Sequence, residues 1–216
     1  MAKKLSFRKV WWLTKSVLGF LTKAEAWKLY RLAARPRPHG DIVEIGAHHG
    51  KKTAFLAAGA LKSGKEVIAV DPFVGRTWLL DILDESKPAH SMEANYIREG
   101  LTGEKAMTAF WNTLERAGLD DGVSLAPVHS QETKADSDIS LLVIDGDPRG
   151  DAVAQDLKNF LPRVVEGGAV VFPDAANPRF ASRRGLLKAL AKNPRAAHHF
   201  LVGSLWGVIL GPPSED

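Results

Sequence analysis

Two aspartates stand one residue apart where an apolar run of the chain ends. In the segment LLVIDGDPRGD, residues 141–151, Asp145 and Asp147 follow four apolar residues directly. Carboxylates at the end of a buried strand can take a proton from a substrate, hold a cation or form a polar turn. The next residue, Pro148, has neither a backbone N–H nor a polar side chain. This segment is therefore a candidate site, with a purely turn-forming role as the alternative.

A second candidate site lies in the segment EIGAHHG, residues 44–50. Gly46 would allow a tight turn and a close approach of ligand to backbone, and Gly50 would let the following helix pack closely on the strand. Asp71 ends the next apolar run, twenty-one residues after Gly50. A carboxylate there can accept hydrogen bonds from ribose hydroxyls, so the spacing predicts a nucleoside site. We expect His48 and His49 to be exposed loop residues rather than catalytic groups.

The turn does not match the usual phosphate sites. A dinucleotide fingerprint needs small residues after its first glycine, where this chain has Ala47, His48 and His49. The segment GKKT, residues 50–53, lacks the earlier glycine of a P-loop at the required spacing. A ligand with a nucleoside but no phosphates fits better, and S-adenosylmethionine is such a ligand.

Composition limits the class of protein. The chain has 216 residues, 45% of them hydrophobic and 25% charged, as in one globular domain. It has no cysteine, which excludes disulfides, thiolate metal sites and a cysteine nucleophile. Nothing in the sequence indicates secretion, and we expect a cytoplasmic protein.

The positive charge is concentrated at the N-terminus. Residues 1–37 hold ten Lys or Arg against Glu25 alone, a net +9, whereas residues 38–216 hold nineteen basic and twenty-four acidic residues, a net −5. Val10, Leu13, Val17 and Leu21 fall on one helical stripe. We expect a basic amphipathic helical arm over 1–37 that packs on its own domain or on a second copy in a homodimer. Peripheral contact with an anionic membrane is the alternative, and no run approaches the roughly 18 apolar residues of a spanning helix.

The remaining chain, 38–216, alternates strands and helices. Strands are predicted at 41–45, 66–70, 123–128, 139–144, 168–172, 200–203 and 206–210, and helices at 22–35, 51–61, 105–117, 151–165 and 183–191. This order predicts an α/β fold: a Rossmann-like, doubly wound, mostly parallel seven-stranded sheet with helices on both faces. The last two strands are too close for a helical crossover, so one should be antiparallel. Residues 72–104, with Trp78, His90 and Tyr96, form a predicted insert or lid.

These segments resemble class I S-adenosylmethionine-dependent methyltransferases, and within them the small group called family 24, related to macrolide and aminocoumarin sugar O-methyltransferases. The resemblance runs from about residue 21 to residue 211. It rests on IVEIGAHHGKKTAFLA, VIAVDPF, AFWNTLERAGLDDGVSLAPVHSQE, LLVIDGDPRGDAVAQDLKNFLP and EGGAVVFPDAA.

The resemblance implies a role for each motif. Residues at the cofactor's methionine part would be Glu44, Gly46, Ala47 and Gly50. Asp71, with Pro72 beside it, would lie at the ribose, and the residues beside the adenine would be His129, Ser130 and Gln131. Asp145 would face the sulfonium and the substrate. Asp147 would be the general base, as in related sugar methyltransferases, and His90 is the other candidate.

Two positions depart from the family pattern. Family members usually read D-G-D-H-S-Y-E where this chain reads DGDPRGD, and H-D where it has Pro173-Asp174. Proline cannot replace histidine as a base or ligand. Some members of the wider group bind Mg²⁺ at these strand ends, which here would use Asp145 and Asp174, with Asp147 or Asn177 as further ligands. In the alternative, these acids only shape the pocket, cap a turn and end a strand.

The sequence thus predicts a methyltransferase that acts on a hydroxyl of a small molecule or glycan, with S-adenosylmethionine as cofactor. No N-P-P-Y-like segment follows the fourth strand, which argues against amino methylation. An RNA methyltransferase that uses the basic arm, and a cofactor-binding protein without catalysis, are the alternatives. Since the body is acidic, we consider a nucleic-acid partner the weaker prediction.

Overall fold

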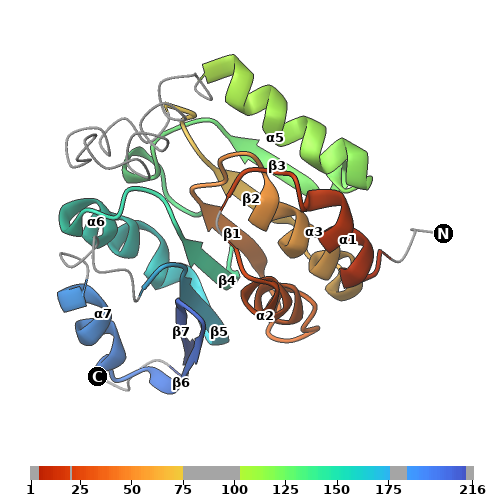
Figure 1. The fold of residues 1–216 in the computed structure, drawn as a ribbon. Coiled ribbons are helices and arrows are strands. Elements are labelled where there is room, and N and C mark those ends of the chain that lie inside the picture. The colour runs from red at the N-terminus through yellow and green to blue at the C-terminus, as the bar shows by residue number, and fades with distance from the viewer. Residues whose placement is uncertain (1–4, 20, 75–102, 176–183, 213–216) are drawn as a thin grey trace.

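A seven-stranded sheet forms the centre of the molecule. The computed structural model describes residues 5–19, 21–74, 103–175 and 184–212. The strand order is β3-β2-β1-β4-β5-β7-β6 (Figure 1). The strands are β1 (Asp41–Ile45), β2 (Val67–Val70), β3 (Val123–Ala126), β4 (Ile139–Ile144), β5 (Val164–Phe172), β6 (Ala196–Val202) and β7 (Leu205–Leu210). Strands β1 to β5 pair in parallel, and β7 is antiparallel to both β5 and β6. The predicted fold class is confirmed.

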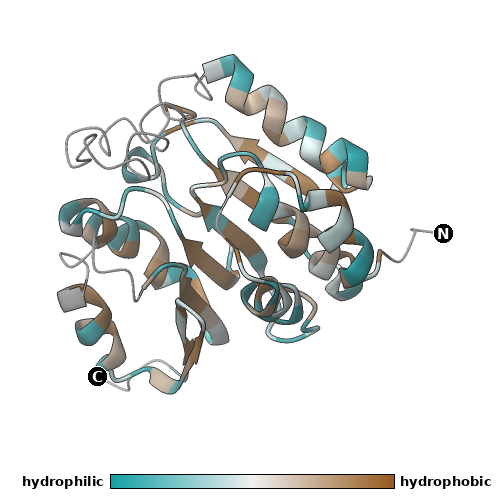
Figure 2. Ribbon diagram, viewed as in Figure 1, coloured by the Kyte–Doolittle hydropathy of each residue, from teal (hydrophilic) through white to brown (hydrophobic). Residues whose placement is uncertain are grey.

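Helices cover both faces of the sheet because its strands are apolar on both sides. In β4, Leu141 and Val143 contribute to one core and Leu142 and Ile144 to the other, as the alternation of side chains along a strand requires. The helices on the first face are α1 (Phe7–Thr14), α2 (Lys23–Ala33), α3 (Lys51–Ser63) and α5 (Gly103–Ala117). Those on the second are α6 (Gly150–Phe160) and α7 (Arg184–Ala191). In Figure 2 the hydrophobic strands lie between these two layers.

The N-terminal helices pack on α3. A side chain at Gly59 of α3 would lie 2.6 Å from the carbonyl oxygen of Tyr30, so only glycine allows α2 to cross this closely. Helix α1 contributes Phe7 and the fully buried Val10 to the same core, and Phe7 contacts the ring of Phe55 in α3. Residues 7–33 are therefore part of the first helical layer.

The first helix is shorter than its apolar stripe. Helix α1 ends at Thr14, whose hydroxyl donates to the carbonyl of Val10, and the predicted continuation through Val17 to Leu21 is wrong. The chain turns there because Lys51, at the start of α3, donates its ammonium protons to the carbonyls of Val17 (2.9 Å) and Gly19 (3.0 Å).

Three further boundaries differ from the prediction by more than two residues. Helix α6 ends at Phe160 rather than near residue 165, because a 3₁₀ turn, η4 (Leu161–Arg163), contains a proline that cannot continue the helix. Strand β5 then begins at Val164, and its register on β4 shifts before Ala169. Gly167 and Gly168 interrupt the apolar pattern, and the pattern therefore did not predict the first half of β5. Strand β6 likewise starts at Ala196, four residues before the predicted start, because the exposed His198 and His199 interrupt the apolar pattern on which the prediction rested.

The predicted insert leaves and rejoins the fold at one point. Gly103 donates its backbone N–H to the carbonyl of Phe73, so the two ends of the intervening segment are adjacent. Residues 75–102, including Trp78, His90 and Tyr96, lie outside the described residues, as does Asn177. In the part of the chain that is described, no helix has the length and apolarity needed to span a bilayer.

Candidate active site

A cleft of about 260 Å³ opens at the carboxyl ends of β1, β2, β3 and β4. In parallel α/β sheets, ligands bind at this edge, at the point where the strand order reverses, which here is between β1 and β4. Predicted site residues that line the cleft are Gly46, Asp71, Pro72, His129, Ser130, Gln131, Asp145 and Asp147. Others in the wall are His48, Phe73, Val74, Ala106 and Arg149.

The glycine turn forms the floor of the cleft between two strand ends. Gly46 has φ +87°, and a Cβ there would lie 2.3 Å from the carbonyl oxygen of Asp145. Gly46 donates its N–H to Val70, and Asp145 donates to Ile45. The ends of β1, β2 and β4 are thus fixed together, and only glycine fits between them.

Asp71 is fixed by the turn that it faces. Its Oδ2 accepts the backbone N–H of His48 (2.7 Å) and its Oδ1 that of Phe73 (2.7 Å). His48 has φ +51° and Phe73 φ +55°, both unusual for side-chain-bearing residues. A carboxylate oxygen accepts more than one hydrogen bond, so Asp71 keeps capacity for two hydroxyl groups. This geometry fits the predicted ribose contact.

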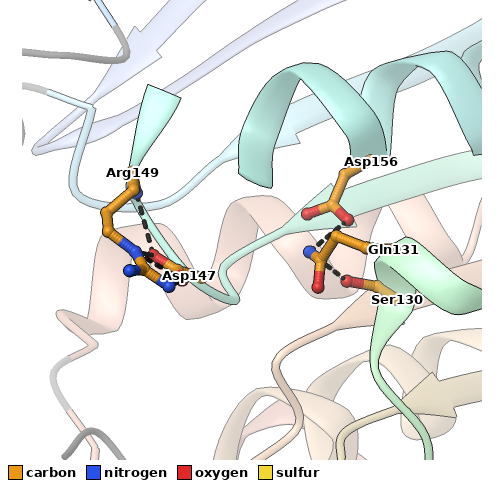
Figure 3. Close-up of polar contacts among 5 residues, drawn as sticks. All are labelled: Ser130, Gln131, Asp147, Arg149 and Asp156. Carbon is orange, nitrogen blue, oxygen red and sulfur yellow. Dashed lines mark hydrogen bonds and ion pairs between the residues drawn. The ribbon is translucent and has the colours of Figure 1, made fainter. Parts of the chain in front are cut away.

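A buried polar network holds the opposite wall. In Figure 3, Gln131 points its amide toward both Ser130 and Asp156, at 2.9 Å from each. Asn159, one turn further along α6, donates to the carbonyls of Ser130 (3.2 Å) and Gln131 (3.0 Å). Burial raises the pKa of Asp156 to about 6 against the opposing effect of its hydrogen bonds. The network anchors the short turn η3 (Ser130–Glu132) to α6.

Sequence reasoning missed Asp156 and Asn159. Their signal was present, since both polar residues fall on the otherwise apolar face of α6 that also carries Val153 and Phe160. A buried polar residue on such a face needs a partner, and the nearby η3 turn supplies it.

Three predicted cofactor residues do not line the cleft: Glu44, Ala47 and Gly50. Glu44 is fully buried beneath it and accepts a hydrogen bond from Thr53 at 2.6 Å. Burial raises the pKa of Glu44 to about 7, although Lys52 and the Thr53 hydrogen bond act in the opposite direction. Gly50, at φ +76°, leaves room for Phe110 of α5 rather than for the strand that we expected it to contact.

A second cavity, of only about 10 Å³, adjoins the cleft. His48 and Asp145 line both spaces. The rest of its wall is Leu18, Gly19, Leu21, Ala47, His49, Lys51, Lys52 and Asp174. The expectation that both histidines are exposed is wrong: His49 is 2% exposed and its ring lies 3.9 Å from that of the half-buried His48, because the turn folds inward over α3.

Lysine 52 forms a buried ion pair with the first aspartate. Its Nζ lies 2.6 Å from Oδ2 of Asp145, and the two side chains are 9% and 10% exposed. Lys52 is also the largest charged influence on Glu44. It therefore places one positive charge between carboxylates from β1 and β4, a role that the sequence analysis did not assign.

The second aspartate shapes a turn. Oδ1 of Asp147 accepts the backbone N–H of Arg149 at 3.0 Å, and the guanidinium of Arg149 binds both carboxylate oxygens (Figure 3). Pro148 between them is buried. The Asp-Pro-Arg sequence thus forms a side-chain-to-backbone turn that leads into α6, and Asp147 reaches the cleft wall with its charge already compensated.

The third aspartate ends β5. Asp174 has φ +54° and accepts a hydrogen bond from Ser204, in the β6–β7 turn, at 3.3 Å. The Ser204 hydroxyl and N–H also contact Oε1 of Glu25 in α2, each at 2.8 Å. Asp174 is therefore connected through Ser204 to the N-terminal helices.

The described residues do not fit a Mg²⁺ site. The ion prefers several carboxylate oxygens and waters in octahedral geometry. Asp145 binds Lys52, Asp147 binds Arg149, and Ala175 follows Asp174. Within residues 5–19, 21–74, 103–175 and 184–212, no group of three or more His, Asp or Glu side chains could hold a metal ion.

Comparison with known proteins places the chain in a family. A family model described as a methyltransferase domain, Methyltransf_24, matches residues 43–175. Among solved structures, the O-methyltransferase NovP is 18% identical, with a TM-score of 0.67 over 88% of this chain and 80% of its own. Cofactor-bound Rv0187 from MTB is 15% identical, with a TM-score of 0.63 over 95% and 89%. An rRNA methylase from Streptococcus thermophilus is 14% identical, with a TM-score of 0.52 over 89% and 99%.

At these identities the structural likeness shows the fold alone, and proteins with this fold differ in their acceptors. The family model, however, covers more than half of the chain, including the glycine turn, Asp71, the η3 turn and the ends of β4 and β5. The chain therefore belongs to the family 24 type of class I S-adenosylmethionine-dependent methyltransferases.

Proposed function

We propose that the protein transfers a methyl group from S-adenosylmethionine to a hydroxyl oxygen of a small molecule or glycan. The observation that carries this proposal is the position of Asp145, which lines both the cofactor cleft and the adjoining cavity. An acceptor hydroxyl at the boundary of the two spaces would meet this carboxylate beside the methyl donor.

The cleft fits the parts of the cofactor. Asp71 would accept the two ribose hydroxyls, Ser130 and Gln131 would lie beside the adenine, and the backbone at Gly46 would approach the methionine part. The cofactor supplies an electrophilic methyl group on a positively charged sulfur. For the cofactor to act as donor, the protein must bind it and align its methyl group with the acceptor.

The transfer would be a single displacement. The acceptor hydroxyl donates a hydrogen bond to Oδ1 of Asp145, and its oxygen forms the new bond to the methyl carbon. The carbon–sulfur bond breaks, and its electron pair stays on sulfur as a neutral thioether. The hydroxyl proton passes to Asp145 and then to water. Of the predicted bases, we favour Asp145 over Asp147, whose carboxylate Arg149 binds through both oxygens.

The experiment has two stages. Calorimetry with S-adenosylhomocysteine tests the cofactor site, and mass spectrometry then follows a +14 Da product across phenols, catechols, sugars and glycosides. Cofactor binding with a methylated hydroxyl supports the proposal. Binding without turnover on any member of the panel would favour the non-catalytic alternative.

The N-terminal helices carry a separate proposal, contact with an anionic membrane. Trp12 and Trp27 are 64% and 44% exposed, and Lys15 and Arg31 lie 5.6 and 5.7 Å from their ring centres. Exposed aromatic rings beside cations are typical of an interfacial surface. Co-sedimentation with vesicles that contain phosphatidylserine should exceed that with neutral vesicles and weaken in a Trp12→Ser, Trp27→Ser variant. Equal binding to both vesicle types contradicts it.

A further inference from the structure

The side chain of Lys52 supplies the positive charge beside Asp145. Lys52 lies in the first turn of α3, directly beneath the glycine turn, and reaches Asp145 at the end of β4 with an Nζ–Oδ2 distance of 2.6 Å. Lysine is rarely buried unless it is paired, and here its side chain is only 9% exposed.

The surroundings of Lys52 are acidic. Glu44 lies close enough for Lys52, Asp145 and Asp71 all to influence its ionisation. Asp174, from the end of β5, lines the same small cavity as Lys52 and Asp145. Four strand ends thus bring acidic residues near Lys52, and acids without a compensating cation would be costly to bury.

We propose that the Lys52 ammonium is the resident cation beside Asp145, so that methyl transfer in this chain needs no divalent metal. Lys52 is a positioning residue in this proposal: it binds Oδ2 of Asp145 and leaves Oδ1 directed toward the acceptor. The statement that methyl transfer needs no divalent metal rests on the proposed function. The statement that Lys52 is the resident cation does not.

The same arrangement has a consequence for the acceptor. A divalent ion binds two neighbouring oxygens of a diol, whereas a single ammonium that is already bound to a carboxylate does not chelate. The site should therefore accept an isolated hydroxyl as readily as a vicinal pair.

The test measures Mn²⁺ binding, by the loss of the free-ion EPR signal, and uses the full chain. Wild-type protein should bind no Mn²⁺ at millimolar concentrations, and Mg²⁺ or EDTA should change its affinity for S-adenosylhomocysteine less than twofold. Lys52→Met removes the charge but keeps the length of the side chain, and should bind Mn²⁺ with a Kd at least tenfold below the highest concentration at which wild type shows no binding. Lys52→Arg retains a cation and, like wild type, should bind no Mn²⁺. In the double variant Lys52→Met, Asp145→Asn the gained binding should disappear.

Lys51→Met is the matched control. This neighbouring lysine binds the carbonyls of Val17 and Gly19 rather than a carboxylate, so its loss should create no Mn²⁺ site. Wild-type protein that binds Mn²⁺ and loses that binding in Asp145→Asn would overturn the proposal, and this measurement does not depend on the folding of Lys52→Met. Absence of S-adenosylhomocysteine binding would instead refute the proposed function and leave the result for cation binding intact.

Discussion

The contact between Asp71 and the ribose permits a quantitative prediction. The carboxylate already accepts one backbone N–H at each oxygen, from His48 and from Phe73. It can therefore add one hydroxyl at each oxygen, and a hydrogen bond to a charged group contributes about 1.5–3 kcal/mol. Asp71→Ala should weaken binding of S-adenosylhomocysteine at least tenfold, about 1.4 kcal/mol, even if only one hydroxyl contact is formed.

The same substitution should also affect stability. It removes the acceptor from two backbone N–H groups that hold the glycine turn against β2, and water can only partly replace it because the site is half-buried. A loss of about 2 kcal/mol, or roughly 4–8 °C in Tm, is expected. Asp71→Asn keeps one acceptor oxygen and should fall between the two proteins in both measurements.

Calorimetry and thermal unfolding on the same samples separate the two effects. Asp41→Ala is the matched control, because this carboxylate lies at the other end of β1 and binds Ser137 at 2.5 Å. It should alter stability only. A folded Asp71→Ala protein that binds S-adenosylhomocysteine within twofold of wild type would refute the assignment of Asp71 to the ribose.

Three further predictions concern other parts of the site. Gly46→Ala, with its Cβ 2.3 Å from a backbone oxygen, should cost more than about 2 kcal/mol of stability and abolish cofactor binding in calorimetry. Gly118→Ala is its control: φ is +63° but nothing lies within 4 Å, so binding should persist. Glu44 is harder to ionise in the fold, so wild-type stability should fall as pH rises from 4.5 through about 7. Glu44→Gln should therefore gain about 3 kcal/mol on wild type between pH 5 and 8.5, seen in Tm profiles, and parallel profiles would contradict the burial argument. Asn159→Ala should raise the Kd for S-adenosylhomocysteine several-fold by releasing the η3 turn, and should cost about 1–3 kcal/mol of stability because two carbonyls lose their donor. An unchanged Kd would show that α6 does not hold this wall.

The fold could be read from the sequence because its signals are local. Strand β1 is followed directly by the glycine turn at Gly46 and strand β4 by Asp145, and the positions of both strands agree with the prediction to the residue. The predicted strands at 168–172 and 200–203 are shorter than the observed β5 and β6, because glycines and exposed histidines interrupt the apolar pattern. Tertiary pairing on β4 and β7 defines these strands, and such pairing is not visible in a local pattern.

The site was only partly predictable for the same reason. Gly46, Asp71 and Asp145 sit at strand ends, and topology brings strand ends to one edge. Lys52 and Asp156 act through partners more than twenty residues away in the sequence. Neither has a neighbouring motif that would identify its partner, and a lysine in the first turn of a helix is ordinarily solvent-exposed. The two prolines that stand in place of the family's histidines indicated a changed site, but not that an arginine and a lysine would bind the carboxylates.

The hydrogen bonds of Glu25 bear on how this chain can be engineered. One oxygen of this α2 residue caps its own helix through Thr22, and the other binds Ser204, which contacts Asp174. Deleting residues 1–37 would therefore remove α1 and α2 from the first helical layer, together with Leu18, Gly19 and Leu21 from the wall of the small second cavity. Exchanging residues 1–37 between related chains should alter that cavity, whereas none of these residues lines the cleft.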